Sequence, residues 1–425
     1  AIPLAAQQLG FQLMGTVDAV LLGHYEKTSL AAAGLGNNLL FALTSIGMGI
    51  VMGLDTVVPQ AIGGRRTLEA RRLLDAGLRL AIGVGLAASL LVLAAPLVLR
   101  LTAVPAEVVE QTWIYIAVRA FGVVPFLLSI ALRSYLAAHN VTRPLIIAVV
   151  IGNIANAGLS SVLIFGLGPV PSLGIIGAAI GTVVVQVAIV AIYFAAVRAL
   201  DPTPRPRGTR EDVVAIVKYG GPVGGQMFAE VGIFGVSTVL AAHLGTVSAA
   251  SHSVALNLGS FTFAVAVGIG ASTSVRVGHA IGAGDRALAR QRGKAGLLIG
   301  LVTMAAFALV FVTLPRPIAS LFTDEHDVIA ATVPLLYIAA LFQLSDGAQA
   351  VAAGALRGLG DTRSTLYGNL FGHYGVGLAI SIALAFGAGM GTPGLWWGLS
   401  AGLTATGLYL VAKFFAGTRP LDAAS

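Results

Sequence analysis

Long apolar segments, separated by short polar breaks, run through the whole chain. A helix of about 20 apolar residues crosses the roughly 30 Å hydrocarbon layer of a bilayer. The runs do not alternate every second residue in segments of about ten, as the strands of a membrane β-barrel do. We therefore predict twelve membrane-spanning helices, near residues 1–23, 34–57, 74–98, 109–132, 144–166, 174–199, 215–241, 249–275, 293–314, 328–353, 364–387 and 393–416.

The composition agrees with a lipid environment. Hydrophobic residues make up 57% of the chain and charged residues 10%, whereas soluble domains carry about 25% charged residues. The absence of cysteine excludes disulfides, thiolate metal sites and cysteine nucleophiles. The net charge of +7 lies in the polar breaks, so it indicates topology and no nucleic-acid partner. The chain begins inside an apolar run, and we expect a short segment to precede it.

Basic residues are concentrated in every second break. The breaks after the second, fourth, sixth, eighth and tenth runs and the end of the twelfth hold most of them, while the remaining breaks hold Lys27, Arg100 and Arg316. Short loops rich in Lys and Arg stay in the cytoplasm. The pattern therefore predicts a multi-pass protein with both termini cytoplasmic.

The two halves of the sequence repeat each other. Equivalent elements keep the same order and orientation, and a parallel repeat of this kind is typical of transporters, with the substrate path between the halves. The proline-rich break at 201–208 separates the halves, so we predict an N-terminal lobe over 1–204 and a C-terminal lobe over 205–425. The matches include His24 with His243, Ala61-Ile62-Gly63 with Ala280-Ile281-Gly282, Leu132-Arg133 with Leu356-Arg357, and Gly177 and Gly181 with Gly398 and Gly402.

Three carboxylates lie well inside predicted spans, Asp18 in the first, Glu230 in the seventh and Asp346 in the tenth. No Lys or Arg is near any of them in the sequence. A carboxylate in the membrane without a cationic partner takes up a proton or coordinates a cation. We predict that all three couple transport to a cation, with Glu230 and Asp346 as ligands if that cation is Na⁺. The alternative is that each only accepts hydrogen bonds from neighbouring helices.

Other residues within the spans are weaker candidates. Hydrogen bonding between helices competes with a role in a substrate path for the polar ones. Arg119 either pairs with a carboxylate or lines a polar cavity, and His252 is expected to be a hydrogen-bonded core residue. The glycine pairs 177/181 and 398/402 are expected to pack helices together. The candidates for a substrate path are Gln7, Asn153, Asn156, Gln226, Asn257, Phe342 and Gln343.

Five motifs along the chain resemble those of the MATE (multidrug and toxin extrusion) transporter family. No Gly-x-x-x-x-Gly-Lys-[Ser/Thr] phosphate loop occurs, so the sequence gives ATP-driven transport no support. The motifs cover nearly the whole length in the order expected. They are Val17-Asp-Ala-Val-Leu-Leu-Gly23, Gly53-Leu-Asp-Thr-Val-Val-Pro-Gln-Ala-Ile-Gly63, Val275-Arg-Val-Gly-His-Ala-Ile-Gly-Ala-Gly284, Ser345-Asp-Gly-Ala-Gln349, and Gly354-Ala-Leu-Arg-Gly358 with Asp361-Thr-Arg363.

The resemblance is closest to the NorM-like bacterial branch, and Asp18, Glu230 and Asp346 fall on its three carboxylate positions. It implies an all-α protein of the inner membrane with two six-helix bundles and no cofactor. It also implies a monomer that exports cationic, amphipathic drugs in exchange for Na⁺ or H⁺. Some sodium-coupled relatives carry Tyr where this chain has Phe342, which weakens the Na⁺ interpretation and leaves it open.

Three other functions compete with antiport. A lipid-linked oligosaccharide flippase would need a cationic cavity for pyrophosphate, whereas the spans contain three carboxylates and Arg119. An intramembrane enzyme would need a nucleophile–base pair or a metal cluster, and none stands out. A channel is less consistent with a twofold repeat that contains buried titratable groups.

Overall fold

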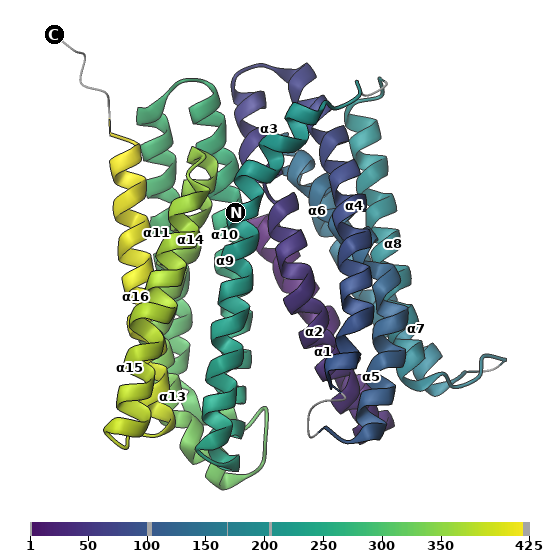
Figure 1. The fold of residues 1–425 in the computed structure, drawn as a ribbon, viewed down its shortest axis with the longest axis vertical. Helices are drawn as coiled ribbons and strands as arrows, with labels where there is room; N and C mark the ends of the chain where they lie inside the picture. Colours follow the sequence, from purple (N-terminus) through teal and green to yellow (C-terminus); the bar gives the residue numbers. More distant parts are fainter. Residues whose placement is uncertain (1, 100–103, 168, 204–205, 420–425) are drawn as a thin grey trace. The chain divides into compact units, whose positions relative to one another are not determined.

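The computed structural model describes residues 2–99, 104–167, 169–203 and 206–419 (Figure 1). Within these ranges the regular elements are helices and no strand occurs. The all-α prediction is therefore confirmed.

The first half contains α1 (Ile2–Tyr25), α2 (Lys27–Val51), α3 (Leu54–Gly63), α4 (Thr67–Leu99), α5 (Ala106–Arg119), the 3₁₀ helix η1 (Ala120–Gly122), α6 (Val123–Ala138), α7 (Arg143–Phe165) and α8 (Gly174–Leu200). The second half contains α9 (Arg210–His243), α10 (Thr246–Gly282), α11 (Arg286–Thr313), α12 (Pro315–Ala319), α13 (His326–Leu359), α14 (Thr362–Asn369), the π-helix η2 (Leu370–Leu378), α15 (Ala379–Ile382), the π-helix η3 (Ala383–Gly387) and α16 (Thr392–Gly417).

Eleven helical segments in the described ranges are long and apolar enough to cross a membrane. They coincide with the predicted spans from the second to the twelfth. The first predicted span is also one continuous helix, α1, of 24 residues. Its glutamines and Asp18 lower the hydropathy of α1.

The chain divides into two compact units by packing. The N-terminal unit comprises Ala6–Ile62 and Arg66–Gly224, and the C-terminal unit comprises Ala1–Ala5, Gly63–Arg65 and Gly225–Ser425. This division falls inside α9, some twenty residues beyond the predicted lobe boundary at 204/205. That boundary, which rests on the internal repeat, stays a prediction.

The break between α8 and α9 packs onto α4, which explains why the start of α9 belongs to the N-terminal unit. Arg71 of α4 forms an ion pair of 2.5 Å with Asp201 and donates to the backbone oxygen of Thr203 over 2.8 Å. Asp75 of α4 accepts from the backbone nitrogen of Gly208 over 2.9 Å. The described residues on both sides of 204–205 are therefore held against α4 by charged and backbone groups.

The internal repeat is visible in the backbone. After α3 the nitrogen of Arg66 donates to Ala61 O over 2.8 Å, and after α10 the nitrogen of Asp285 donates to Ala280 O over 2.9 Å. The residue directly before each donor has a left-handed backbone conformation, with φ of 59° at Arg65 and 79° at Gly284. This is the usual hydrogen-bonded end of a helix. Its recurrence at the predicted separation shows the same helix end in both units.

A second pair of helix ends corrects the alignment in part. The same arrangement follows α6 and α13, with left-handed residues at Asn140 and Gly360. Aligning these two residues displaces Arg133 from Arg357 by about one helical turn. The sequence match of Leu132-Arg133 with Leu356-Arg357 is therefore out of register with the helix ends.

The glycines predicted to pack helices do so. A Cβ on Gly177 of α8 would meet the backbone of Leu163 in α7, and a Cβ on Gly398 of α16 would meet the backbone of Ser381 in α15. Only glycine lets these backbones approach so closely.

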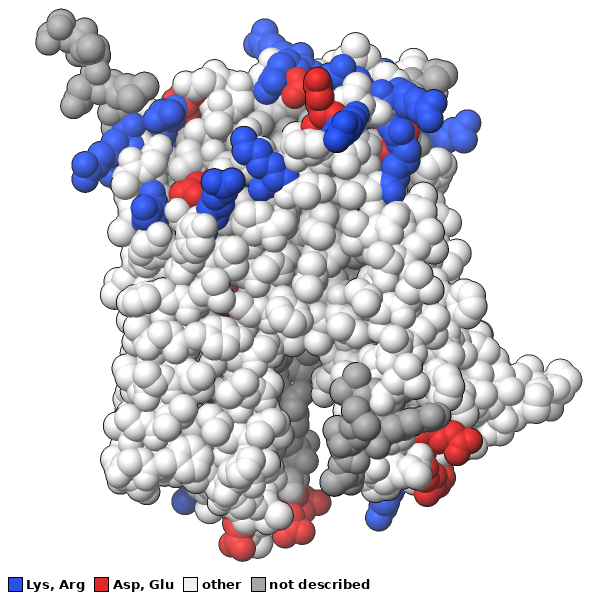
Figure 2. Space-filling model, viewed as in Figure 1, with Lys and Arg blue, Asp and Glu red and all other residues white. Residues whose placement is uncertain are grey.

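The charge asymmetry of the sequence persists in the folded chain. In Figure 2, Lys and Arg gather mainly at one end of each unit, the middle of the surface is almost free of charge, and Asp and Glu with a few basic residues lie at the other end. Large apolar side chains such as Leu90 and Leu298 are exposed, as expected of helices that face lipid.

Candidate functional site

Asp18 is held between three helices of the N-terminal unit. Its Oδ1 accepts from Ser160 Oγ over 3.0 Å and from Asn156 Nδ2 over 3.2 Å. Its Oδ2 accepts from Thr182 Oγ1 over 2.5 Å. Asn156 and Ser160 are four residues apart and therefore lie on one face of α7, while Thr182 comes from α8. With only 3% of its surface exposed, Asp18 is a buried carboxylate held by neutral donors.

Arg119 lies in the same unit and attracts Asp18 electrostatically. Its guanidinium carbon is 5.7 Å from the centre of the Tyr115 ring, and the Tyr115 hydroxyl donates to Asn37 Oδ1 over 3.1 Å. Arg119 therefore stacks on an aromatic ring and affects Asp18 from a distance without forming an ion pair with it.

Glu230 is the centre of a second polar cluster, in the C-terminal unit. Its Oε1 accepts from Asn369 Nδ2 over 2.5 Å, from Gln349 Nε2 over 2.7 Å and from Gln226 Nε2 over 3.1 Å. These amides come from α14, α13 and α9, so three donors on three helices converge on one oxygen. Glu230 itself is half-buried.

Asp346 belongs to the same cluster. It is 3% exposed, and it and Glu230 repel each other electrostatically. Its Oδ2 is buried and accepts no hydrogen bond from any described residue. Two neighbouring carboxylates, one without donors, create a site that a proton or a metal cation would stabilise.

The amides around Glu230 add further acceptors to this site. With their nitrogens bonded to Glu230, Gln349 Oε1 and Asn369 Oδ1 remain buried, and no described group donates to them. Hard cations such as Na⁺ prefer carboxylate and amide oxygens. Beside the three amide donors that converge on Glu230, the cluster therefore contains buried oxygens that a cation could use.

No described Lys, Arg or His forms an ion pair with Asp18, Glu230 or Asp346. Arg357 attracts Glu230 at longer range. In the part of the chain that the structure describes, no group of three or more His, Cys, Asp or Glu side chains is placed to hold a metal ion. Any Na⁺ would therefore rely on amide or backbone oxygens besides the two carboxylates of the C-terminal unit.

The other candidate residues divide into two groups. The structure brings Asn156 to Asp18 and Gln226 to Glu230, as described above. Gln7 donates to the Tyr193 hydroxyl over 2.9 Å, Asn153 donates to Gly10 O over 3.0 Å, and Gln343 donates to Thr262 Oγ1 over 2.5 Å.

Those three amides form hydrogen bonds between neighbouring helices, which is the alternative to a role in a substrate path. Phe342 is buried with its ring centre 5.5 Å from that of Trp396. Asn257 is exposed and bonds to Ser253 O of its own helix. A role in a substrate path stays a prediction for all seven.

The sequence did not identify Ser160 and Thr182 as partners of Asp18. Ser and Thr in membrane helices commonly bond to their own backbone, so their residue type alone does not mark a site. The four-residue spacing of Asn156 and Ser160 was the available signal. The sequence also missed the buried ion pair of 3.0 Å between Asp55 of α3 and Arg133 of α6, because Asp55 lies near the end of a predicted span.

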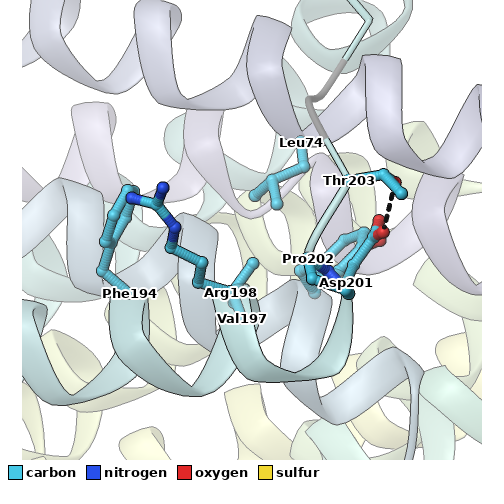
Figure 3. Close-up of a pocket in the computed structure, with 8 residues that line it drawn as sticks. Leu74, Phe194, Val197, Arg198, Asp201, Pro202 and Thr203 are labelled. Carbon is cyan, nitrogen blue, oxygen red and sulfur yellow. Dashed lines mark hydrogen bonds between the residues drawn. The ribbon is translucent and has the colours of Figure 1, made fainter.

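A cavity of about 230 Å³ lies at the end of the N-terminal unit where the 201–203 segment runs (Figure 3). Thr203 Oγ1 donates to Asp201 Oδ1 over 3.0 Å beside it. None of the candidate residues is among those that line it, so this cavity is separate from the carboxylate clusters. Its lining residues are Leu74, Tyr135, Phe194, Val197, Arg198, Asp201, Pro202 and Thr203.

Known proteins match the chain over nearly its whole length. The MatE family model matches residues 3–162 and 222–389. The chain is 33% identical to the multidrug resistance protein NorM of Burkholderia vietnamiensis, over 100% of this chain and 94% of that protein. It is 34% identical to a probable multidrug resistance protein NorM of Deinococcus radiodurans, over 98% of this chain and 94% of that protein.

Solved structures show the same fold. The crystal structure of the eukaryotic MATE transporter AtDTX14 superimposes with a TM-score of 0.90 at 21% identity, covering 98% of this chain and 95% of that one. The Vibrio cholerae MATE transporter VcmN in its bent form gives a TM-score of 0.88 at 20% identity, covering 98% and 95%.

Proposed function

Because this chain belongs to the MatE family, whose members are transporters and not enzymes, we propose that it is a multidrug efflux antiporter that exports cationic, amphipathic compounds in exchange for H⁺ or Na⁺. We place it in the inner membrane with both termini in the cytoplasm, from the distribution of basic residues in the sequence. The names of its NorM relatives support a drug substrate.

The acceptor-rich cluster around Glu230 and Asp346 is the observation that carries this proposal. Buried polar groups in proteins are normally hydrogen-bonded, yet Asp346 Oδ2, Gln349 Oε1 and Asn369 Oδ1 receive no hydrogen bond from the described residues. A cation bound in this cluster would supply a missing partner. A proton does the same locally, because it converts a carboxylate oxygen into a donor.

The mechanism follows from competition for negative charge. Glu230 and Asp346 attract an organic cation when both are ionised. Two unit charges 4 Å apart attract by about 4 kcal/mol at an effective dielectric constant of about 20. Neutralising one carboxylate therefore weakens retention of the drug by about three orders of magnitude. Alternating access needs only that the drug and the coupling ion prefer opposite conformations.

Asp18 supplies a second cation site in this mechanism. Its ionised form accepts from Ser160, Asn156 and Thr182, and protonation would weaken at least one of these bonds or reverse its direction, because the protonated oxygen becomes a donor. A change in charge at Asp18 would therefore rearrange α1, α7 and α8 relative to one another. We assign this cluster to the ion-dependent conformational step.

Ethidium efflux from liposomes that contain the purified protein tests the proposal, with either an imposed H⁺ gradient or an imposed Na⁺ gradient. Asp346→Asn should abolish gradient-driven efflux. Asp327→Asn is the matched control, because Asp327 is an exposed residue in the first turn of the same helix. The absence of efflux from folded wild-type protein under both gradients would favour the lipid-linked oligosaccharide flippase instead.

A further inference from the structure

His373 is a buried side chain that the proposed mechanism does not use. It lies in η2, a nine-residue π-helix, and is 1% exposed. Neither of its ring nitrogens has a hydrogen-bond partner among the described residues. A buried polar group without a partner lowers stability and requires an explanation, and π-helical turns are frequent at functional sites.

The position of His373 relates it directly to Glu230. Asn369, which donates to Glu230, precedes His373 by four residues, so the two side chains leave the helix on nearly the same face. On α9, Phe234 follows Glu230 by four residues, and its ring centre is 6.3 Å from that of His373. Glu230 with Asn369 and Phe234 with His373 therefore form successive layers, about 6 Å apart along α9.

This contact between α9 and η2 is fixed by the residue that follows His373. The Tyr374 hydroxyl donates to Ala229 O over 2.8 Å, next to Glu230 in the chain. The imidazole is thereby held one layer away from the coupling carboxylate.

The other buried histidine of the C-terminal unit, His252, differs in one respect. Its Nδ1 accepts from Trp396 Nε1 over 3.2 Å, which leaves Nε2 to donate to Thr238 Oγ1 over 3.4 Å. A histidine that passes a proton on must accept with one nitrogen and donate with the other. Both nitrogens are occupied in His252, whereas both are available in His373.

The groups that face His373 favour a passing positive charge. Glu230 lies one layer away on α9, Asp346 belongs to the same carboxylate cluster on α13, and His252 of α10 is engaged by Trp396. Between Thr392 and Ala412, α16 carries no Asp, Glu, Lys, Arg or His. The ionised groups of this cluster are therefore the two carboxylates, together with Arg357 of α13, which attracts Glu230 at longer range.

We propose that His373 is a proton relay between water and the Glu230–Asp346 pair, so that the coupling ion of the C-terminal unit is H⁺. This inference rests on the proposed antiport. A proton from water binds one free ring nitrogen, and the imidazolium passes the proton on its other nitrogen through one bridging water to the Glu230 carboxylate. The imidazole returns to its neutral form, and one proton has moved from water to the carboxylate.

Efflux driven by a pH gradient, measured as a function of pH, tests the relay. His373→Gln should slow H⁺-driven ethidium efflux at least about tenfold, flatten its pH profile, and leave the equilibrium affinity for ethidium within about twofold. His252→Gln is the matched control, because it replaces an equally buried histidine of the same unit. It should keep the wild-type pH profile.

Two further variants protect the test against misfolding. His373→Asn places an amide near the position of Nδ1, whereas His373→Gln places one near that of Nε2. Phe234→Tyr retains His373 but adds a hydroxyl to the aromatic ring that His373 contacts. Both should change the pH profile of efflux. A wild-type rate and pH profile in whichever of the three variants folds would overturn the relay.

The failure of the relay is distinguishable from the failure of antiport. Wild-type protein that exports ethidium under a Na⁺ gradient but not under a pH gradient contradicts the relay and retains antiport. Wild-type protein that exports under neither gradient contradicts the proposed function itself.

Discussion

Asn369 and Glu230 are joined by a hydrogen bond of 2.5 Å from Nδ2 to Oε1, which ties α14 to α9 at the centre of the C-terminal unit. Asn369 lies directly before the π-helix, and Glu230 lies near the middle of a long continuous helix. The bond therefore connects the charge of Glu230 to the position of a helix that departs from α-helical geometry.

Asn369→Leu should reduce gradient-driven efflux about tenfold or more, because a hydrogen bond to a charged group contributes about 1.5–3 kcal/mol. Initial rates of ethidium efflux from liposomes measure the effect. Asn38→Leu is the control, since Asn38 is an exposed asparagine of α2 that donates to none of the three carboxylates. Equal rates in the two variants would contradict the role given to Asn369.

Thr182→Val should impair efflux several-fold while the protein stays folded. The substitution preserves shape but removes the hydroxyl that donates to Asp18 Oδ2, and one such bond contributes about 1.5–3 kcal/mol. Thr16→Val removes a hydroxyl that bonds to Gln12 O in α1 and should have little effect. The comparison uses efflux rates at equal amounts of reconstituted protein.

Asp55→Asn should destabilise the protein by about 3–5 kcal/mol, because it leaves Arg133 buried without its counter-charge. Thermal unfolding in detergent measures the loss of stability, with the height of the monodisperse elution peak recorded as the temperature rises. The double variant Asp55→Asn/Arg133→Met should recover much of it. If the double variant is no more stable than the single one, the ion pair is not what Asp55 contributes.

His139→Gln should reduce the dependence of stability on acid pH. His139 lies just beyond the end of α6, and burial lowers its pKa below the usual 6.5, although the Tyr135 carbonyl and Asp201 act in the opposite direction. As the pH falls below about 6.5, the unfolded state binds a proton that the folded state does not, so stability decreases. The melting temperature of the wild type should therefore fall more between about pH 7.5 and 5.5 than that of the variant.

The spans and the three carboxylates could be predicted because their signals are local. An apolar run has a length that can be read directly, and an ionisable residue inside it stands out whatever surrounds it. Asp18, Glu230 and Asp346 were found in this way. The packing division within α9 was not, because it depends on how Arg71 and Asp75 hold the 201–208 segment.

The partners of the carboxylates were less accessible from the sequence. Thr182 contacts Asp18 because of how α8 is rotated against α1, and no local pattern contains that rotation. The difference between His252 and His373 is similar, since both are single histidines in apolar runs. Only the folded structure shows that Trp396 and Thr238 engage the first, while the second has no described partner.

In the proposed mechanism, the drug and the coupling ion compete for Glu230 and Asp346. The release of the ion on drug binding measures this competition. Ethidium is added to purified protein in weakly buffered detergent solution, and the release of H⁺ or of bound Na⁺ is recorded. The wild type should release at least one cation for each ethidium bound, and Asp346→Asn should release fewer. Tight ethidium binding to the wild type without release of either ion would contradict this mechanism.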